Sequence, residues 1–503
     1  MPKSYVKRIL DAQIYDLVVR TPIDEAPQLS LRLGNRVLLK REDLQPIFSF
    51  KLRGAYNKML SLSEAELAKG VIAASAGNHA QGLAMAAQKI GAKATIVMPT
   101  TTPQIKVNAV KALGAKVILQ GDSYDEASDY AQRLVAEKEM TYIHPFDDPE
   151  VIAGQGTIAM EILQQVPERL DAVFIAVGGG GLCAGMAAYI KTVRPEIKVI
   201  AVEAEDSACL DAAMKAGRRV RLKNVGIFAD GTAVAQIGKE TFRILKDTVD
   251  EVITVSIDEI CASIKDTFDD TRSICEPAGA LGLAGLKKYV ERTGAKGQTL
   301  LAVECGANIN FDRLRYISER TEIGEKREAI LAVTIPEEPG SFKAFCASLN
   351  KRNITEFNYR MGSASQAHIF VGVQVVSDDD RYSLVADLDG KGYPVADMTD
   401  NEIAKLHIRH MVGGRAKEAT DEMIFTFEFP ERPKALMRFL TRLGDRWNIS
   451  MFHYRNHGSA DGQVLAGLQI PAKDRKQAHI FFDDLGYSWA EETENPAYQF
   501  FLS

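Results

Sequence analysis

Short β-branched runs alternate with amphipathic stretches over roughly the first 320 residues, and this alternation restricts the fold more than any other feature. KATIVMP, from Lys93, and DAVFIAV, from Asp171, each precede a helical pattern. Strands that alternate with helices at this spacing predict a mostly parallel sheet that helices cover on both faces. Ligands of such α/β folds bind in the loops at the carboxyl ends of the strands.

The pattern changes after Arg320. The stretch TEIGEKREA is charged and short of apolar residues, which predicts a linker. Beyond it, PEEPGSFKAF…NITEFNYR recurs as PERPKALMRF…NISMFHYR, with an offset of 94 residues at Pro339 and 95 at Tyr359. A constant offset indicates duplicated modules, each expected to run strand, turn, helix, strand, strand, helix, strand. We expect an α/β domain over 1–322 and two α+β modules over 329–401 and 423–494.

Charge and cysteine usage exclude several classes of protein. The net charge is −6 and no long basic run occurs, so we expect no nucleic-acid partner. Six cysteines without a CxxC pair indicate neither a zinc ribbon nor a disulfide scaffold. The N-terminus lacks the apolar run of a signal peptide, and glycines interrupt the uncharged stretch 172–190, which is too broken for a membrane helix. These features predict a cytoplasmic protein without a membrane partner.

The motif SFKLRGAY contains a lysine, Lys51, between two apolar residues, Phe50 and Leu52. Burial would lower the pKa of this lysine and favour the neutral amine, which can form a Schiff base. The alternative is a lysine that extends from an amphipathic helix into solvent.

Three further motifs follow strand-like runs. In SAGNHAQG, small residues at a strand-to-helix turn let backbone N–H groups approach an anion, and Asn78 adds a side-chain donor. The four glycines of VGGGGL predict a loop for a phosphate monoester, without the spacing of a P-loop or a dinucleotide fingerprint. ECGAN contains the thiol of Cys305. The alternatives are a structural histidine at His79, a glycine turn that allows close packing, and an inert buried cysteine.

Taken in order, SxKxRG, SxGNH, GGGGL and GAN resemble the pyridoxal-phosphate (PLP) enzymes of fold type II, which are tryptophan synthase β-like. Within them the chain resembles the threonine/serine dehydratases. A catalytic domain followed by two ACT-like modules is similar to the layout of biosynthetic threonine ammonia-lyases, so the resemblance covers essentially the whole chain. It implies a PLP-dependent lyase that converts L-threonine, and secondarily L-serine, in the committed step of isoleucine biosynthesis. The products from threonine would be 2-oxobutanoate and ammonia. It also implies inhibition by L-isoleucine, activation by L-valine and a homotetramer.

The resemblance also implies roles for individual residues. Lys51 would hold PLP as a Schiff base and remove the α-proton, and Phe50 would pack against the pyridine ring. Asn78 would bind the ring hydroxyl, and Cys305 would face the ring nitrogen without charging it. The phosphate would bind at Gly178, Gly179, Gly180, Gly181 and Leu182, the substrate carboxylate at Ser75, Gly77 and His79, and the effector at Tyr359, Arg360, Tyr454 and Arg455.

Some positions separate the chain from related enzymes. Ala76 stands where serine racemases of this fold carry a serine, and Lys51-Leu52-Arg53 differs from the KDR of the sulfhydrylases. Glu203 could bind a divalent cation, but Ser207 and Cys209 lie where further oxygen ligands are needed, so we expect no metal. Two alternatives remain open: an amino-acid sensor with an inactive PLP-like domain, and a degradative dehydratase, which usually lacks the duplicated tail.

Overall fold

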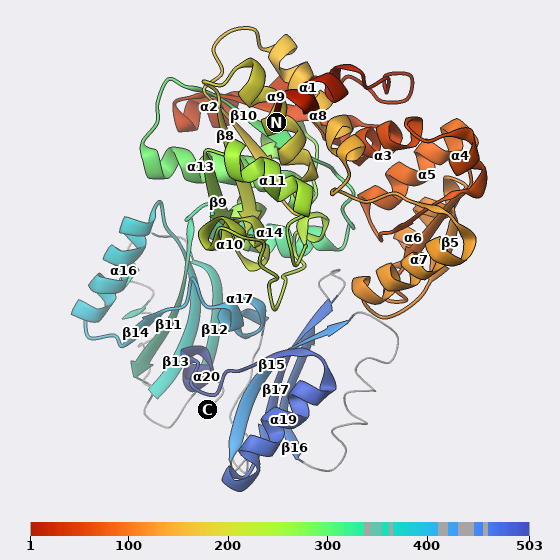
Figure 1. The fold of residues 1–503 in the computed structure, drawn as a ribbon. Coiled ribbons are helices and arrows are strands. Elements are labelled where there is room, and N and C mark those ends of the chain that lie inside the picture. The colour runs from red at the N-terminus through yellow and green to blue at the C-terminus, as the bar shows by residue number, and fades with distance from the viewer. Residues whose placement is uncertain are drawn as a thin grey trace. The chain divides into compact units, whose positions relative to one another are not determined.

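The computed structural model describes residues 2–336, 344–345, 348–349, 352, 354–361, 366–410, 421–430, 447–455 and 461–501. The chain divides into two compact units, 1–310 and 311–503 (Figure 1). This division assigns the helix that follows Asn310 to the second unit. The domain limits expected from the sequence, 1–322, 329–401 and 423–494, stay predictions.

The first unit contains two sheets. The six-stranded sheet has the order β1-β2-β10-β7-β8-β9 and is parallel except between β1 and β2; the four-stranded sheet β5-β4-β3-β6 is parallel throughout. β3, β4 and β7 are buried along their whole length, as expected of parallel strands that are covered on both faces. The strands are β1 (Ile23–Glu25), β2 (Arg36–Arg41), β3 (Val71–Ala74), β4 (Ala94–Met98), β5 (Lys116–Leu119), β6 (Thr141–Tyr142), β7 (Ala172–Ala176), β8 (Lys198–Ala204), β9 (Glu251–Val255) and β10 (Thr299–Glu304).

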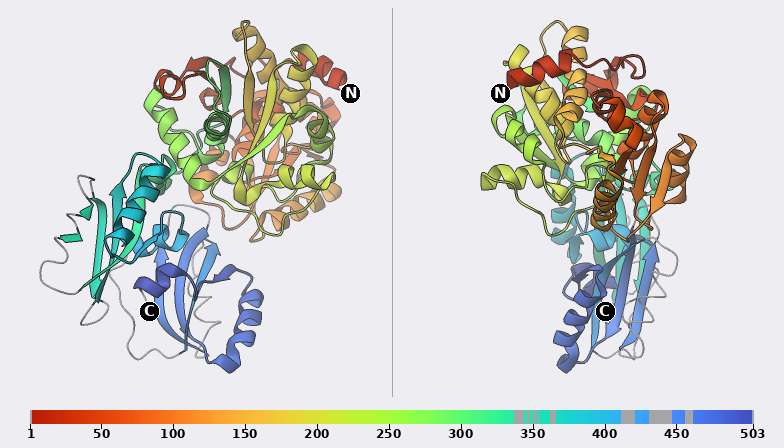
Figure 2. Two further views of the ribbon diagram at one scale, coloured as in Figure 1. Left: turned by 90° about the vertical axis from the view of Figure 1, so that its left-hand side faces the viewer. Right: turned by 45° about the vertical axis from the view of Figure 1, so that its right-hand side comes forward.

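Helices surround both sheets (Figure 2). They are α1 (Pro2–Leu10), α2 (Pro27–Leu33), α3 (Lys51–Leu60), α4 (Glu64–Lys69), α5 (Asn78–Ile90), α6 (Gln104–Ala112), α7 (Tyr124–Lys138), α8 (Pro149–Gln165), α9 (Gly181–Val193), α10 (Cys209–Ala216), α11 (Lys239–Thr248), α12 (Ile257–Thr271) and α13 (Pro277–Thr293). The predicted α/β domain is confirmed, although its strands form two sheets where the alternating pattern suggested one.

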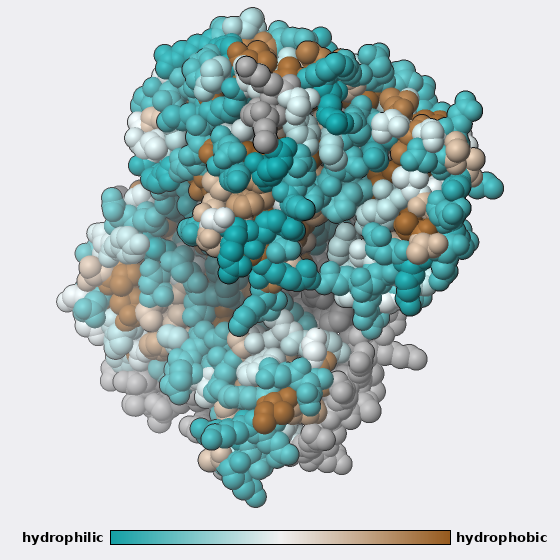
Figure 3. Space-filling view, in the orientation of Figure 1, coloured by the Kyte–Doolittle hydropathy of each residue, from teal (hydrophilic) through white to brown (hydrophobic). Residues whose placement is uncertain are grey.

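The uncharged stretch 172–190 consists of β7, the glycine turn and most of α9. Among the described helices, none combines the length and the apolar character that crossing a membrane requires. Hydrophilic residues dominate the face of the first unit that is drawn in space-filling form (Figure 3).

The second unit contains two antiparallel four-stranded sheets with equivalent strand orders, β12-β13-β11-β14 and β16-β17-β15-β18. The shared order agrees with the duplication expected from the repeat. Pro339 and Pro433 lie outside the described residues, as does the first helix expected in the second module; of the first helix expected in the first module, only 344–345 and 348–349 are described. The elements are α14 (Arg313–Gly324), β11 (Glu328–Pro336), β12 (Ile354–Met361), β13 (Gln366–Gln374), α16 (Asp378–Gly390), β14 (Val395–Asp397), α17 (Glu402–Leu406), β15 (Glu422–Pro430), β16 (Asn448–Arg455), β17 (Asp461–Gln469), α19 (Arg475–Leu485), β18 (Ser488–Glu491) and α20 (Pro496–Phe501).

The predicted linker TEIGEKREA is wrong. α14 continues to Gly324, and β11 begins at Glu328. The charges of this stretch have partners within the fold: Arg327 lies 3.1 Å from Glu325, and Arg409 lies 2.9 Å from Glu328. Charged composition predicted a solvated connection, but these charges are paired with other residues of the fold.

Besides the core of each module, one hydrophobic cluster contains residues of both modules, among them residues of α17 and α20. Asn401 and Asn495 occupy equivalent positions in the repeat, and Nδ2 of Asn401 donates to Oδ1 of Asn495 at 3.0 Å. The ring of Phe501, in α20, packs edge-on against Phe370 of β13, with centroids 5.5 Å apart. The helix α20 therefore packs against the sheet of the first module.

Candidate active site

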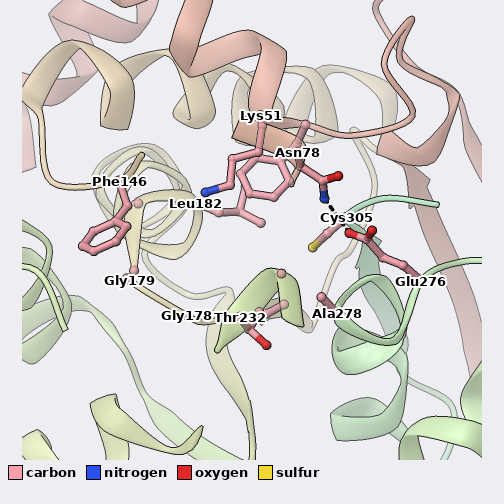
Figure 4. Close-up of a pocket in the computed structure, with 15 residues that line it drawn as sticks. Lys51, Asn78, Phe146, Gly178, Gly179, Leu182, Thr232, Glu276, Ala278 and Cys305 are labelled. Carbon is pink, nitrogen blue, oxygen red and sulfur yellow. Dashed lines mark hydrogen bonds between the residues drawn. The ribbon is translucent and has the colours of Figure 1, made fainter. Parts of the chain in front are cut away.

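A pocket with about 450 Å³ of free space lies in the first unit, where segments that follow β3, β7 and β10 come together (Figure 4). It is lined by Phe50, Lys51, Asn78, Phe146, Ala176, Gly178, Gly179, Gly180, Gly181, Leu182, Gly231, Thr232, Glu276, Ala278 and Cys305.

Lys51, the first residue of α3, extends into this pocket (Figure 4). Its Nζ donates to the carbonyl of Pro145 at 3.0 Å and lies 5.3 Å from the centroid of the Phe50 ring. Burial lowers the pKa of Lys51 to about 8, although Cys305 and Glu276 act in the opposite direction. A substantial fraction of the amine is therefore neutral near pH 8 and able to act as a nucleophile or a base.

Backbone pairing places the lysine motif beside the cysteine motif. Ser49 forms an antiparallel bridge with Gly306, and the N–H of Phe50 donates to the carbonyl of Cys305 at 3.2 Å. Cys305 follows β10, and its Sγ donates to the carbonyl of Val303 at 3.5 Å. Burial, together with nearby carboxylates, raises the pKa of this thiol, which stays protonated at neutral pH.

The glycine loop between β7 and α9 presents N–H groups to the pocket. Within the described structure, none of the four glycine N–H groups donates to another part of the protein. The carbonyls of Gly178 and Gly179 instead accept from the Cys209 thiol at 3.4 Å and the Thr241 hydroxyl at 2.8 Å. Gly180 has a φ of +92°, and a Cβ at Gly179 would overlap the Phe146 ring. Unshared N–H groups at the N-terminus of a helix fit a phosphate.

Asn78 begins α5 and belongs to a hydrogen-bonded group of three side chains. Its Nδ2 donates to Oε1 of Glu276 at 2.6 Å, and its Oδ1 accepts from Nδ2 of Asn308 at 2.7 Å. Asn308 also donates to the carbonyl of Ile47 at 2.8 Å. The side chain predicted to bind the cofactor's ring hydroxyl is thus fixed at the edge of the pocket.

The residues expected to bind the substrate carboxylate, Ser75, Gly77 and His79, are not among those that line this pocket. Ser75 and Gly77 lie in the turn before α5, where a Cβ at Gly77 would meet no described atom within 4 Å. His79 is buried, with Nε2 2.8 Å from the carbonyl of Ile143, and burial lowers its pKa to about 3. It is therefore neutral, and the carboxylate roles of the three residues stay predictions.

The effector residues stay predictions too. Tyr359 and Arg360 lie on β12, opposite Ile369 and His368 of β13. Tyr454 and Arg455 lie at the equivalent positions of β16. The side chains of all four lie outside the described part of the structure.

Several residues that line the pocket belong to none of the four sequence motifs. Glu276 directly precedes Pro277 and α13, a pattern that predicts the start of a helix and no ligand contact. Phe146 lies between β6 and α8, and Thr232 ends a short 3-10 helix, Asp230–Thr232; nothing local indicates a site at either residue. Glu203, weighed as a metal ligand, accepts the N–H groups of Leu210 and Asp211, each at 2.8 Å, at the start of α10. In the part of the chain that is described, no group of three or more potential metal ligands occurs.

The reactive and hydrogen-bonding groups of the pocket fit PLP. The Lys51 amine can react with an aldehyde, and the glycine loop leaves N–H groups for a phosphate. With its two parallel sheets, the first unit has the architecture of a fold type II PLP enzyme. A family model for pyridoxal-phosphate dependent enzymes matches residues 14–306. A model for the C-terminal regulatory domain of threonine dehydratase matches 319–408 and 413–502.

Comparison of whole chains gives the family within this class. The L-threonine dehydratase biosynthetic IlvA of Burkholderia multivorans is 56% identical over 503 residues, with 99% of each chain covered. The IlvA of Escherichia coli is 52% identical over 501 residues, covering 99% of this chain and 97% of that one. The structure of the processed form of threonine deaminase isoform 2 from Solanum lycopersicum has a TM-score of 0.63 and 48% identity, over 63% of this chain and 93% of that chain. The chain belongs to the biosynthetic threonine dehydratase family.

Proposed function

We propose that the protein is a threonine ammonia-lyase that converts L-threonine to 2-oxobutanoate and ammonia, with L-serine as a secondary substrate. One observation carries the proposal: a buried amine and a loop of unshared N–H groups line the same pocket. The full-length relatives named threonine dehydratases support threonine as the substrate. The reaction is the committed step of isoleucine biosynthesis.

The pocket residues would hold PLP in a fixed orientation. Lys51 would anchor it covalently, Phe50 would pack against its ring, and Asn78 would donate a hydrogen bond to its ring hydroxyl. When bound, PLP supplies an electron sink for the negative charge that develops at the substrate α-carbon. The phosphate would be held by the N–H groups of the glycine loop and the residue after it, Gly178, Gly179, Gly180, Gly181 and Leu182.

Lys51 is suited to move the α-proton. With its pKa lowered to about 8, the amine is basic enough to accept a proton and is often neutral at physiological pH. Cys305 contributes no charge opposite the ring nitrogen, because its thiol stays protonated. An uncharged partner there favours loss of the β-hydroxyl over transamination.

The substrate carboxylate is proposed to bind at the turn of Ser75, Gly77 and His79. Support comes from the position of this turn, because it forms the N-terminus of the 13-residue helix α5. The positive end of a helix favours an anion.

The C-terminal modules are proposed to bind L-isoleucine as an inhibitor and L-valine as an activator. The match to a regulatory domain and the duplicated strand order support a regulatory role. We further propose that Tyr359, Arg360, Tyr454 and Arg455 contact the effector, that the domains span 1–322, 329–401 and 423–494, and that the chain forms a cytoplasmic homotetramer.

A substrate panel tests the activity. The holoenzyme is mixed with L-threonine or L-serine, with and without L-isoleucine and L-valine, while 2-oxo acid and ammonia are measured. We expect faster turnover of threonine than of serine, inhibition by isoleucine and its relief by valine. Absence of 2-oxobutanoate from threonine would refute the proposed reaction, and activity indifferent to isoleucine would refute the regulation.

A further inference from the structure

Glu276 supplies a carboxylate to the pocket, and neither the motifs nor the roles proposed above account for it. The residue is 4% exposed and directly precedes α13. Its backbone N–H donates to the carbonyl of Gly306 at 3.0 Å. Its side chain makes no capping hydrogen bond to α13, so helix capping does not explain a buried glutamate at this position.

The hydrogen bonds of Glu276 determine which way the Asn78 amide points. An ionised carboxylate only accepts hydrogen bonds, so the amide must turn its NH₂ group toward Oε1 of Glu276, at 2.6 Å. At the other end, the carbonyl of Ile47 also only accepts and therefore fixes the NH₂ group of Asn308, 2.8 Å away. Asn308 then donates to Oδ1 of Asn78 at 2.7 Å. Because Glu276 and the Ile47 carbonyl both accept, only one orientation of the Asn78 and Asn308 amides satisfies all three hydrogen bonds.

One N–H of Asn78 remains for a ligand. Nδ2 carries two hydrogens and Glu276 accepts one; among the described residues no acceptor takes the other. Figure 4 shows the Asn78 side chain at the edge of the pocket, joined to Glu276 by a hydrogen bond. Because the acceptor is a buried carboxylate, the hydrogen bond that holds Asn78 is charge-assisted and stronger than a neutral one.

We propose that Glu276 is a positioning residue, which holds the Asn78 amide so that its second N–H faces the cofactor. The inference rests on the proposed function only in taking PLP as the ligand of this pocket. Glu276 acts through Asn78, so the two side chains should behave as one unit when the cofactor binds.

A double-mutant cycle on PLP binding tests the inference. Apoprotein of the wild type, Glu276→Gln, Asn78→Ala and the double variant is titrated with PLP, and affinity and the visible absorption band are recorded. Glutamine has nearly the size of glutamate but offers Asn78 a neutral amide oxygen, so the hydrogen bond loses its charge assistance and Asn78 is held less firmly. We expect Asn78→Ala to bind PLP about 10- to 100-fold more weakly and Glu276→Gln about tenfold more weakly, because a neutral acceptor makes roughly half the hydrogen bond that a carboxylate makes. The double variant should bind as Asn78→Ala does.

Glu304→Gln is the matched control. Glu304 is another buried carboxylate of the first unit, accepts from Thr267 Oγ1 at 2.7 Å and is not part of the pocket lining. We expect this variant to keep the wild-type PLP affinity and absorption band. Circular dichroism and thermal unfolding establish that each variant is folded.

Three results would overturn the role of Glu276: unchanged PLP affinity and absorption in Glu276→Gln, losses that add in the double variant, or an equal loss in Glu304→Gln. Threonine turnover of the wild type is measured separately. A wild-type protein that binds PLP but forms no 2-oxobutanoate would refute the proposed reaction, while the binding cycle would still decide the role of Glu276. A wild type that binds no PLP would refute both.

Discussion

Arg53 belongs to the lysine motif but points away from the pocket lining, into a network of buried charges. Its guanidinium is fully buried and donates to Glu42 at 2.8 Å and to Glu161 at 2.6 Å. Lys40 donates to Glu161 at 2.7 Å, so two positive and two negative side chains balance. This network anchors α3, the helix that Lys51 begins.

Arg53→Ala should therefore destabilise the fold strongly. Removing one partner of a buried pair leaves unpaired charge and costs about 3–5 kcal/mol of the free energy of unfolding. Arg36→Ala is the control, because Arg36 is half-exposed and pairs with the exposed Glu168 at 2.8 Å. We expect the control to lose about 1 kcal/mol or less in urea unfolding. Equal losses in the two variants would contradict a structural role for the network.

The lowered pKa of Lys51 predicts a dependence on pH. Only the neutral amine reacts with an amine-directed reagent, so labelling of Lys51 in the apoprotein should rise with pH, with a midpoint at about 8. Lys7, whose side chain is exposed, serves as the internal control. Quantitative mass spectrometry of both peptides measures the two profiles. If the two labelling profiles coincided, burial would not lower the pKa of Lys51.

Two loops that follow parallel strands are expected to respond differently to the same change. At Gly179, in the loop after β7, an added methyl would overlap the Phe146 ring, whereas at Gly77, after β3, it would meet no described atom within 4 Å. The loop after β7 is therefore closely packed, and the turn after β3 has room for a ligand.

We expect Gly179→Ala to weaken PLP binding by more than about tenfold. The added methyl would push the loop away from Phe146, and its N–H groups would then lie too far from the phosphate for hydrogen bonds. Gly77→Ala should keep its cofactor and instead raise KM for threonine, because the methyl would enter the proposed carboxylate site. PLP titration and steady-state kinetics distinguish the two effects. A normal KM in Gly77→Ala would argue against substrate binding at that turn.

Local patterns predicted the elements of the site well. The strand, glycine turn and helix at 172–190 follow from a short apolar run and four glycines, which act over a few residues. The partnership of Asn78 with Glu276 joins segments about 200 residues apart, and no local pattern reports it. The linker error has the same origin, because the partner of Glu328, Arg409, lies 81 residues away. Pairing that depends on the tertiary fold is what the sequence could not show.

The two tryptophans of the chain, Trp447 and Trp489, both belong to the second unit. Trp447 is 7% exposed in the core of the second module, and Nε1 of Trp489 donates to Asp483 at 3.0 Å. Both rings pack against Phe482. Tryptophan emission therefore reports on the regulatory modules without a background from the catalytic unit.

If L-isoleucine binds the modules, it should change tryptophan emission over the same concentration range in which it inhibits threonine turnover. Effector and substrate affinities must be linked through two states of the protein, so each ligand should alter the apparent affinity for the other. Trp447→Phe and Trp489→Phe assign the signal to one ring. Inhibition without any change in emission would place the isoleucine site outside the second module, which contains both tryptophans.

The central claim, that the Lys51 amine carries the cofactor and the chemistry, is tested most directly by Lys51→Ala. Wild-type protein and variant are compared for PLP absorption, for borohydride-trapped cofactor mapped by mass spectrometry, and for 2-oxobutanoate formed from L-threonine. We expect the wild type to trap PLP on Lys51 and to form 2-oxobutanoate. The variant should lose both, with an unchanged circular dichroism spectrum. Trapping at another lysine, or full turnover by Lys51→Ala, would contradict the account.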